Sequence, residues 1–366
     1  MPYTQIKPDQ IKVFPLSQRK SKSEISEIAI NPDEPPPPAP EIAETVKNAA
    51  ERIRFARKSG ASVILAFGAH LVKNGAAPLL IKLMEQGWIT HLATHGAGGI
   101  HDWEFAFHGK SEEDVRANAA TGTFGTWEET GKVINLAVQA GALKGMGYGE
   151  SLGACIENEG IEIPSPEQLE QQIKNGLAHT DDLLPARTEF LNTIKKFNLP
   201  SGFKQIQHPY KQYSLFGNAY RLKVPVTVHP GIGYDIIYNN PYANGAALGR
   251  GAHIDYGIFV NSALHLSNGV FLSIGSAIMA PQVFEKALSF ANNILLRNGE
   301  KISNFFILID DLQESVWDWT KGEPPKNSPD YYLRFLKSFH RMGGSVKYIA
   351  ADNRLLLHHL YAKLNE

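Results

Sequence analysis

Residues 61–99 have the sequence ASVILAFGAHLVKNGAAPLLIKLMEQGWITHLATHGAGG, and this stretch decides the fold class. It begins with a continuous apolar run, residues 61–67, which is typical of a parallel strand covered on both faces. A helical pattern over residues 77–86 and a strand-like run over residues 88–94 follow. The stretch therefore predicts a βαβ unit that ends in a glycine loop at Gly96–Gly99.

The same alternation of strand and helix returns in the second half of the chain. Helical patterns begin near Glu41, Pro281 and Asp330. Further strand-like runs, each followed by polar or glycine-rich residues, cover residues 224–228, 269–273, 305–309 and 345–349. These elements predict an α/β fold with a doubly wound, mostly parallel, Rossmann-like sheet.

The N-terminal part of the chain differs from the rest. Residues 31–40 read NPDEPPPPAP, and four consecutive prolines form neither a helix nor a central strand. We therefore expect an N-terminal arm and Pro-rich connector over residues 1–40. The arm either packs on the body, packs on a neighbouring subunit, or stays partly disordered. Residues 41–366 are predicted to form a single domain with a mostly helical insertion at about residues 111–215.

Composition and charge exclude several classes of protein. The 366 residues contain 36 Lys and Arg against 37 Asp and Glu, so no net charge attracts the chain to nucleic acid or to an anionic membrane. The single cysteine, Cys155, forms no intrachain disulfide and is expected to be a small buried apolar residue. The polar N-terminus and the lack of any 18-residue apolar run predict a soluble, cytoplasmic protein.

Polar and glycine residues follow the predicted strands. In open α/β sheets ligands bind beyond the carboxyl ends of the strands, and glycines let backbone N–H groups approach a phosphate. The residues at these ends are His70, His95–Asp102, His229–Asp235, Ser273–Ser276, Asp310, Asp311 and Asp352. They favour a phosphate-bearing cofactor. None matches G-x-G-x-x-G, however, and the same turns also serve as tight connections without a ligand.

A divalent metal is the alternative ligand. His101, Glu104 and His108 would share one helix face. His70, His101, Asp102 and His229, which all follow strands, would be the ligands of a metal-dependent hydrolase or lyase. Solvated or hydrogen-bonded side chains on an exposed helix are the competing interpretation.

Two strand-end motifs resemble those of the deoxyhypusine synthase superfamily. Gly68–Val72 (GAHLV) is similar to a family loop that ends in Asn-Leu-Ile, with His70 at the position of an asparagine that contacts NAD. Gly96–Trp103 (GAGGIHDW) is similar to Thr-Ala-Gly-Gly-Val-Glu-Glu-Asp, with Asp102 at an acidic position near the nicotinamide and the amine substrate. The whole resemblance covers about residues 55–110 and 218–365.

Later motifs extend the resemblance. Pro230–Asp235 is similar to Asp-Gly-Ser-Leu-Gly-Asp, and Ile349–Asp352 is similar to a Tyr-Ala-Asp-Ala strand end. Pro329–Lys337 is similar to Pro-Asp-Glu-Ala-Val-Ser-Trp-Gly-Lys, whose lysine forms a covalent imine with the butylamine unit. Four positions depart from the family pattern: Pro230 replaces an acid, Ala280 a histidine, Tyr331 a glutamate and Phe335 a tryptophan.

The resemblance implies a Rossmann-like, NAD-binding transferase or oxidoreductase that assembles as a homotetramer. It implies cofactor-binding roles for His70, Gly96, Ala97, Gly98, Gly99, Gly275, Ser276, Ala351 and Asp352. It implies that Lys337 is the covalent residue, and that Asp102, His101 and Asp235 act on the substrate as acids, bases or ammonium partners.

The departures indicate a smaller substrate than spermidine, because buried ammonium groups require charged partners and fewer carboxylates remain. The sequence thus predicts an NAD-dependent enzyme that acts on a small amine- or hydroxyl-bearing molecule rather than one that transfers butylamine from spermidine to a lysine. The metal-dependent hydrolase or lyase and a non-catalytic nucleotide-binding protein stay as alternatives.

Overall fold

The computed structural model describes residues 3–366, apart from the side chains of Thr320 and Arg334. Its main sheet has six parallel strands in the order β10-β9-β8-β2-β3-β7. The strands are β2 (Val63–Phe67), β3 (His91–Thr94), β7 (Val226–Val228), β8 (Val270–Ile274), β9 (Phe306–Asp311) and β10 (Ser345–Ala350). Numbered along the chain, these strands have the order 6-5-4-1-2-3, which is that of the Rossmann fold. The predicted doubly wound sheet is confirmed.

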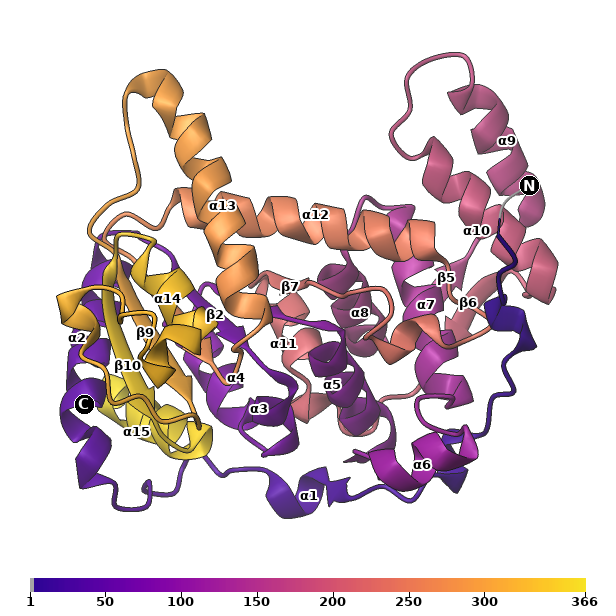
Figure 1. The fold of residues 1–366 in the computed structure, drawn as a ribbon. Coiled ribbons are helices and arrows are strands. Elements are labelled where there is room, and N and C mark those ends of the chain that lie inside the picture. Colours follow the sequence, from indigo (N-terminus) through magenta and orange to yellow (C-terminus); the bar gives the residue numbers. More distant parts are fainter. Residues whose placement is uncertain (1–2) are drawn as a thin grey trace. The chain divides into compact units, whose positions relative to one another are not determined.

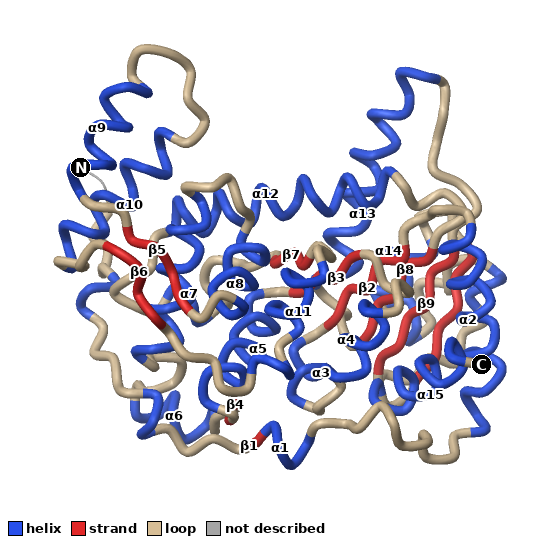
Figure 2. Tube along the Cα trace, turned by 180° about the vertical axis from the view of Figure 1, so that it is seen from behind, coloured by secondary structure: helices blue, strands red, loops and turns tan. Residues whose placement is uncertain are grey.

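Burial along the strands explains why the sequence predicted them. Every residue of β2, β3 and β8 is buried, so these strands need apolar side chains on both faces. Strand β10 lies at one edge of the sheet and is only partly buried. In Figure 2 the six strands run side by side as red segments.

Helices cover both faces of this sheet (Figure 1). Helix α15 (Asn353–Asn365) packs on α2 (Ala43–Lys58) and α4 (Ala77–Glu85), and α2 also contacts β2 and β8. Helices α13 (Met279–Leu295) and α14 (Arg334–His340) pack on each other. A core of apolar side chains holds them on the sheet, with Phe271 of β8 stacked on Phe284 of α13 at a ring-centroid distance of 4.0 Å.

Contacts divide the chain into two compact units. The sheet unit consists of Ile28–Gly98, Leu222–His229 and Tyr256–Glu366. The helical unit consists of the residues up to Glu27 together with Gly99–Arg221 and Pro230–Asp255. Along the chain, the helical unit therefore interrupts the sheet unit between β3 and β7 and again between β7 and β8. The predicted division at residue 40 stays a prediction, and the first two residues of the predicted arm lie outside the described residues.

The remaining helices and strands belong mostly to the helical unit. Its helices are α6 (Val115–Thr121), α7 (Glu128–Ala142), α8 (Tyr148–Glu157), α9 (Pro166–Gly176), α10 (Leu184–Phe197) and α11 (Leu215–Leu222). Two antiparallel pairs join β1 (Ser23–Glu24) to β4 (Lys110–Ser111) and β5 (Gly160–Ile163) to β6 (Gly202–Gln205). Helices α1 (Ile25–Ile28), α5 (Gly96–His108) and α12 (Gly245–Leu264) run from one unit into the other, and α3 (Ala69–Lys73) follows β2. Cys155 is buried in α8, as predicted.

The glycine loop predicted after β3 is wrong, because Gly96–Gly99 form the first turn of α5. A Cβ atom at Gly98 would lie 2.2 Å from Oγ1 of Thr94, which itself donates a hydrogen bond to the Phe67 carbonyl. Gly98 thus lets the helix start directly against the end of β3. None of the helices in residues 3–366 has the length and apolar character needed to cross a membrane.

Candidate functional site

The carboxyl ends of the parallel strands form one edge of the sheet unit, which we call the carboxyl edge. Strands β2 and β8 are neighbours at its centre, with Val63 opposite Val270 and Phe67 opposite Ile274. The chain builds the sheet outward in one direction from β2 and in the other from β8. This is the topological switch point, where Rossmann-like folds bind dinucleotides.

The turns that follow β2 and β8 touch each other through their backbones. The Gly68 N–H donates a hydrogen bond to the Ile274 carbonyl at 3.1 Å. A Cβ atom at Gly68 would lie 2.0 Å from the Gly275 carbonyl oxygen. Gly275 has a φ of +58° and donates its N–H to the Asp310 carbonyl at 2.8 Å. Glycine is therefore required at both positions, and the ends of β2, β8 and β9 are held together.

Eight of the nine predicted cofactor-binding residues follow strands at the carboxyl edge: His70, Gly96, Ala97, Gly98, Gly275, Ser276, Ala351 and Asp352. The ninth, Gly99, begins the helical unit's share of α5.

The side chains of Ser276 and Asp352 form structural contacts. Ser276 Oγ accepts a hydrogen bond from the Ala280 N–H at 3.3 Å. Asp352 caps α15 and forms an ion pair with Arg354 at 2.6 Å. The hydrogen bonds from Arg354 lower the pKa of Asp352.

Asp310 is the residue at this edge whose importance the sequence did not reveal. Asp310 was predicted just after a strand, but it lies within β9, one residue before the end of that strand, and is 1% exposed. Among the described residues no side chain donates a hydrogen bond to either carboxyl oxygen. Burial raises the pKa of Asp310 to about 8; the backbone N–H of Ala351 acts against this rise, and the charges of Asp311 and Asp352 add to it. A buried carboxyl group without a side-chain partner beside a switch point is typical of a ligand-binding site.

Lys337 lies on α14 in the sheet unit. Its ammonium group is 3.7 Å from the centroid of the Tyr331 ring. Tyr331 occupies the position where the resembled family has a glutamate, so an aromatic ring contacts this lysine here. The covalent role of Lys337 stays a prediction.

Asp102 has a structural role in the helical unit. Its carboxylate accepts hydrogen bonds from Ser214 Oγ at 2.5 Å, from the Leu215 N–H at 2.6 Å and from the Phe216 N–H at 3.3 Å. Asp102 therefore caps the N-terminus of α11 from a distant part of the chain. Burial raises the pKa of Asp102 to about 6 in spite of these hydrogen bonds.

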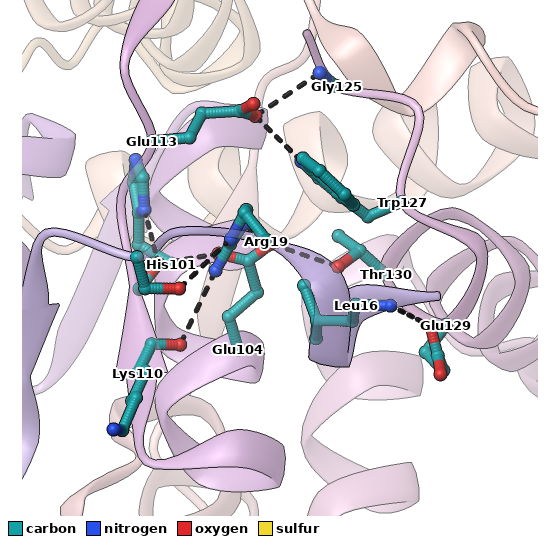
Figure 3. A network of polar contacts seen from close by, with 12 residues as sticks. Leu16, Arg19, His101, Glu104, Lys110, Glu113, Gly125, Trp127, Glu129 and Thr130 are labelled. Carbon is teal, nitrogen blue, oxygen red and sulfur yellow. Dashed lines mark hydrogen bonds and ion pairs between the residues drawn. The ribbon is translucent and has the colours of Figure 1, made fainter. Parts of the chain in front are cut away.

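His101 and Glu104 belong to a polar network that fastens the N-terminal arm (Figure 3). Glu104 forms an ion pair with Arg19 at 2.6 Å and accepts hydrogen bonds from Ser111 and Thr130. His101 Nδ1 lies 2.7 Å from the Ser111 hydroxyl. The arm thus packs on the body, which was one of its three predicted states.

The metal centre finds no support in this geometry. In residues 3–366, no group of three or more His, Cys, Asp and Glu side chains is arranged to hold a metal ion. Of the four predicted ligands, His101 and Asp102 belong to the helical unit, and His70 and His229 belong to the sheet unit.

Asp235 has the most available carboxylate among the predicted acids of the helical unit. It is 7% exposed, and its Oδ1 accepts a hydrogen bond from the Ile237 N–H at 3.3 Å. Its Oδ2 and the Tyr148 hydroxyl have no hydrogen-bond partner among the described residues. Burial raises the pKa of Asp235 to about 6.

Three tyrosines surround the Asp235 carboxylate. Burial, with the Asp235 charge second, raises the pKa values of Tyr148, Tyr234 and Tyr238. A buried carboxylate near aromatic rings is a suitable environment for an ammonium group.

No known protein family and no curated protein matches the chain. Solved structures that match are the apo form of ArgZ, an arginine dihydrolase from the ornithine-ammonia cycle in cyanobacteria, a putative LOR/SDH protein from Methanococcus maripaludis S2, and the complex of AgrE with ornithine and NAD+. The ArgZ match has 13% identity and a TM-score of 0.42, and covers 87% of this chain and 32% of ArgZ. The Methanococcus match has 12% identity and a TM-score of 0.42, and covers 93% of this chain and 72% of the other. The AgrE match has 12% identity and a TM-score of 0.42, and covers 90% of this chain and 34% of AgrE.

The chain spans about a third of the length of ArgZ and of AgrE. The resemblance to the deoxyhypusine synthase superfamily stays a prediction. The strand order of the chain itself shows that the protein has a Rossmann-like, doubly wound α/β sheet.

Proposed function

We propose that this protein binds NAD at the carboxyl edge and acts as an NAD-dependent enzyme on a small amine-bearing substrate. The strand order, with its switch point between β2 and β8, is the observation that carries the proposal. The open space at Gly275 supports it, because the one atom found near an added Cβ there is Asn353 Nδ2, at 3.8 Å, so a ligand can approach the backbone of this turn closely.

The residues present at the carboxyl edge fit a dinucleotide. Gly275 and Ser276 lie beside the switch point, and His70 is exposed next to it on α3. Asp310 is protonated at neutral pH and offers an O–H donor and a carbonyl acceptor, the pair of groups that a carboxamide or a ribose hydroxyl requires. NAD, when bound, supplies a hydride acceptor.

Asp235 is the proposed partner of the substrate amine. Above pH about 6 its carboxylate is ionised and carries an unpaired oxygen, so an ammonium group would satisfy both its charge and its hydrogen-bonding capacity. A single such carboxylate suits a monoamine better than a polyamine. Following the family resemblance, the proposal includes an imine at Lys337 and assembly as a homotetramer.

The test is an assay of NADH formation by the purified protein with NAD+ and a series of primary amines and amino alcohols. We expect Asp235→Asn to raise KM for the amine at least tenfold, whereas Asp182→Asn, which alters an exposed aspartate of the same unit, leaves KM unchanged. No NADH with any amine, together with saturable NAD binding, would favour the non-catalytic nucleotide-binding protein. Absence of saturable NAD binding by the purified protein would refute the proposal.

A further inference from the structure

Four polar side chains form a continuous chain of hydrogen bonds within the sheet unit. The Ser262 hydroxyl lies 2.7 Å from His91 Nδ1, and His91 Nε2 lies 3.0 Å from the Thr227 hydroxyl. The same hydroxyl lies 3.1 Å from His229 Nε2. The ring atom His229 Nδ1 takes no part in this chain.

The strand register brings these side chains to one face of the sheet. Ala93 of β3 is opposite Thr227 of β7, and side chains two residues apart on a strand point to the same face. His91 therefore shares this face with Thr227, and His229 continues it just beyond the end of β7. Ser262 reaches the face from α12.

The middle of this chain of hydrogen bonds is buried, and its two ends are partly exposed to solvent. His91 and Thr227 are 0% exposed, whereas Ser262 and His229 are only partly buried. The edge of the Phe259 ring contacts both imidazoles, with centroid distances of 5.3 Å to His91 and 5.5 Å to His229. These hydrogen bonds thus connect the first residue of β3, through the protein interior, to the carboxyl edge.

Both imidazoles are neutral at physiological pH. Burial, with the neighbouring His229 second, lowers the pKa of His91 to about 3, and burial lowers the pKa of His229 to about 4. A neutral imidazole has one N–H donor and one acceptor nitrogen, so it can take up a proton at one nitrogen while it releases another proton from the other.

We infer that Ser262, His91, Thr227 and His229 form a proton wire that exchanges protons between the carboxyl edge and solvent. A reacting hydroxyl or amine at the edge gives its proton to His229 Nδ1, and His229 passes its Nε2 proton to the Thr227 oxygen. Thr227 passes its own proton to His91 Nε2, and His91 passes its Nδ1 proton to Ser262, whose hydroxyl proton leaves to water. Every group ends neutral, and one proton has moved.

The wire has two states, and they differ in the tautomers of both histidines. Before transfer, His229 carries its proton on Nε2 and His91 on Nδ1. After transfer, His229 carries it on Nδ1 and His91 on Nε2. The two imidazoles therefore always have opposite tautomers. The identity of the group that supplies the proton, the oxidised amine or hydroxyl, rests on the proposed function, whereas the wire itself does not.

The test is nitrogen NMR of the full-length protein labelled with 15N-histidine, with His91 and His229 assigned from His→Gln variants. We expect opposite tautomers at the two residues in the unaltered protein. Thr227→Val should remove the dependence of one histidine's tautomer on that of the other, and Thr227→Ser, which keeps the hydroxyl, should restore it. The same tautomer at both residues of the unaltered protein would overturn the proposal, whether or not the variants fold.

Exchange of the His91 N–H with water distinguishes a wire from a purely structural chain. Ser262→Ala removes the exit to solvent, so the wire predicts exchange at least tenfold slower than in the unaltered protein. If the hydrogen bonds only hold the fold together, the same variant loosens the structure and exchange is unchanged or faster. Neither measurement requires NAD or turnover, so failure of the wire is distinguishable from failure of the proposed function.

Discussion

Asp310 should make the stability of the folded protein fall as the pH rises from about 4 to about 8. Its folded pKa of about 8 lies above the value of about 3.9 expected in the unfolded chain, so only the folded state holds this proton between those values. The buried histidines have lowered pKa values, so their effect is opposite: they make the free energy of unfolding rise with pH. This effect acts only below pH about 6.5.

We therefore expect the free energy of unfolding to fall by roughly 2 kcal/mol between pH about 6.5 and about 8. Urea denaturation at both pH values measures this fall. Asp310→Asn should remove most of it, and Asp182→Asn, at an exposed position, should leave it unchanged. An equally steep fall in the Asp310→Asn variant would contradict this assignment.

Asp102 tests whether a residue predicted as catalytic is structural. Asp102→Ala removes the acceptor of two backbone N–H groups and one hydroxyl at the start of α11, so we expect a loss of about 1–3 kcal/mol in the free energy of unfolding. Chemical denaturation measures the loss. A variant as stable as the unaltered protein would show that the cap contributes nothing.

The sequence could not have revealed this role. Asp102 lies in a motif that resembles a family's acidic site, but its partners Ser214, Leu215 and Phe216 follow it by 112 to 114 residues. Hydrogen bonds over that separation depend on how the helical unit folds. Asp310 shows the converse, because its position near the carboxyl end of a strand was visible in the sequence, and its burial without a side-chain partner was not.

At the scale of elements, the turns at the switch point allow no side chain. Gly68→Ala would place a Cβ 2.0 Å from the Gly275 carbonyl oxygen, so the ends of β2 and β8 would have to separate. We expect a lowered midpoint of thermal unfolding and weaker NAD binding. The control is Gly249→Ala in α12, where no atom lies within 4 Å of the added Cβ and alanine favours a helix. Equal changes in the unfolding midpoint and in NAD binding for the two substitutions would show that the contact between Gly68 and Gly275 is unimportant.

A buried ion pair between Arg19 and Glu104 is one of the contacts that hold the N-terminal arm. Arg19→Met leaves the Glu104 carboxylate buried without its cation, and breaking such a pair costs about 3–5 kcal/mol. The control is Lys22→Met, whose ion pair with Asp114 is half-exposed and is worth at most about 1 kcal/mol. Denaturant titrations compare the two variants, and a loss in Arg19→Met no larger than in Lys22→Met would contradict this view of the arm.

Elements of the sheet were predictable because their physical requirements are local. Strands β2 and β8 are continuous apolar runs, as two-sided burial demands, and α2 shows helical spacing that ends near Gly60. The start of α5 was not predictable in this way. Its glycines suggest a loop, and only the position of Thr94 explains why a helix begins there.

For the whole molecule, the doubly wound, mostly parallel sheet was predictable and the composition of the site was not. The right-handed βαβ rule leaves few arrangements for six parallel strands with these connections. The pairing of Asp102 with α11 and the environment of Asp235 depend on the helical unit, two of whose three pieces are inserted after β3 and after β7. No periodic pattern of the sequence relates these two insertions.

The central claim, that NAD binds at the carboxyl edge, is tested most directly by thermal unfolding of the metal-free protein titrated with NAD+, NADH, NADP+ and divalent metals. A ligand that binds only the folded state stabilises it by about 2.7 kcal/mol at a hundredfold excess over Kd. We predict a saturable rise in the unfolding midpoint with a dinucleotide, reduced in Gly68→Ala and retained in Gly249→Ala. A rise with a divalent metal and none with any dinucleotide would contradict the claim.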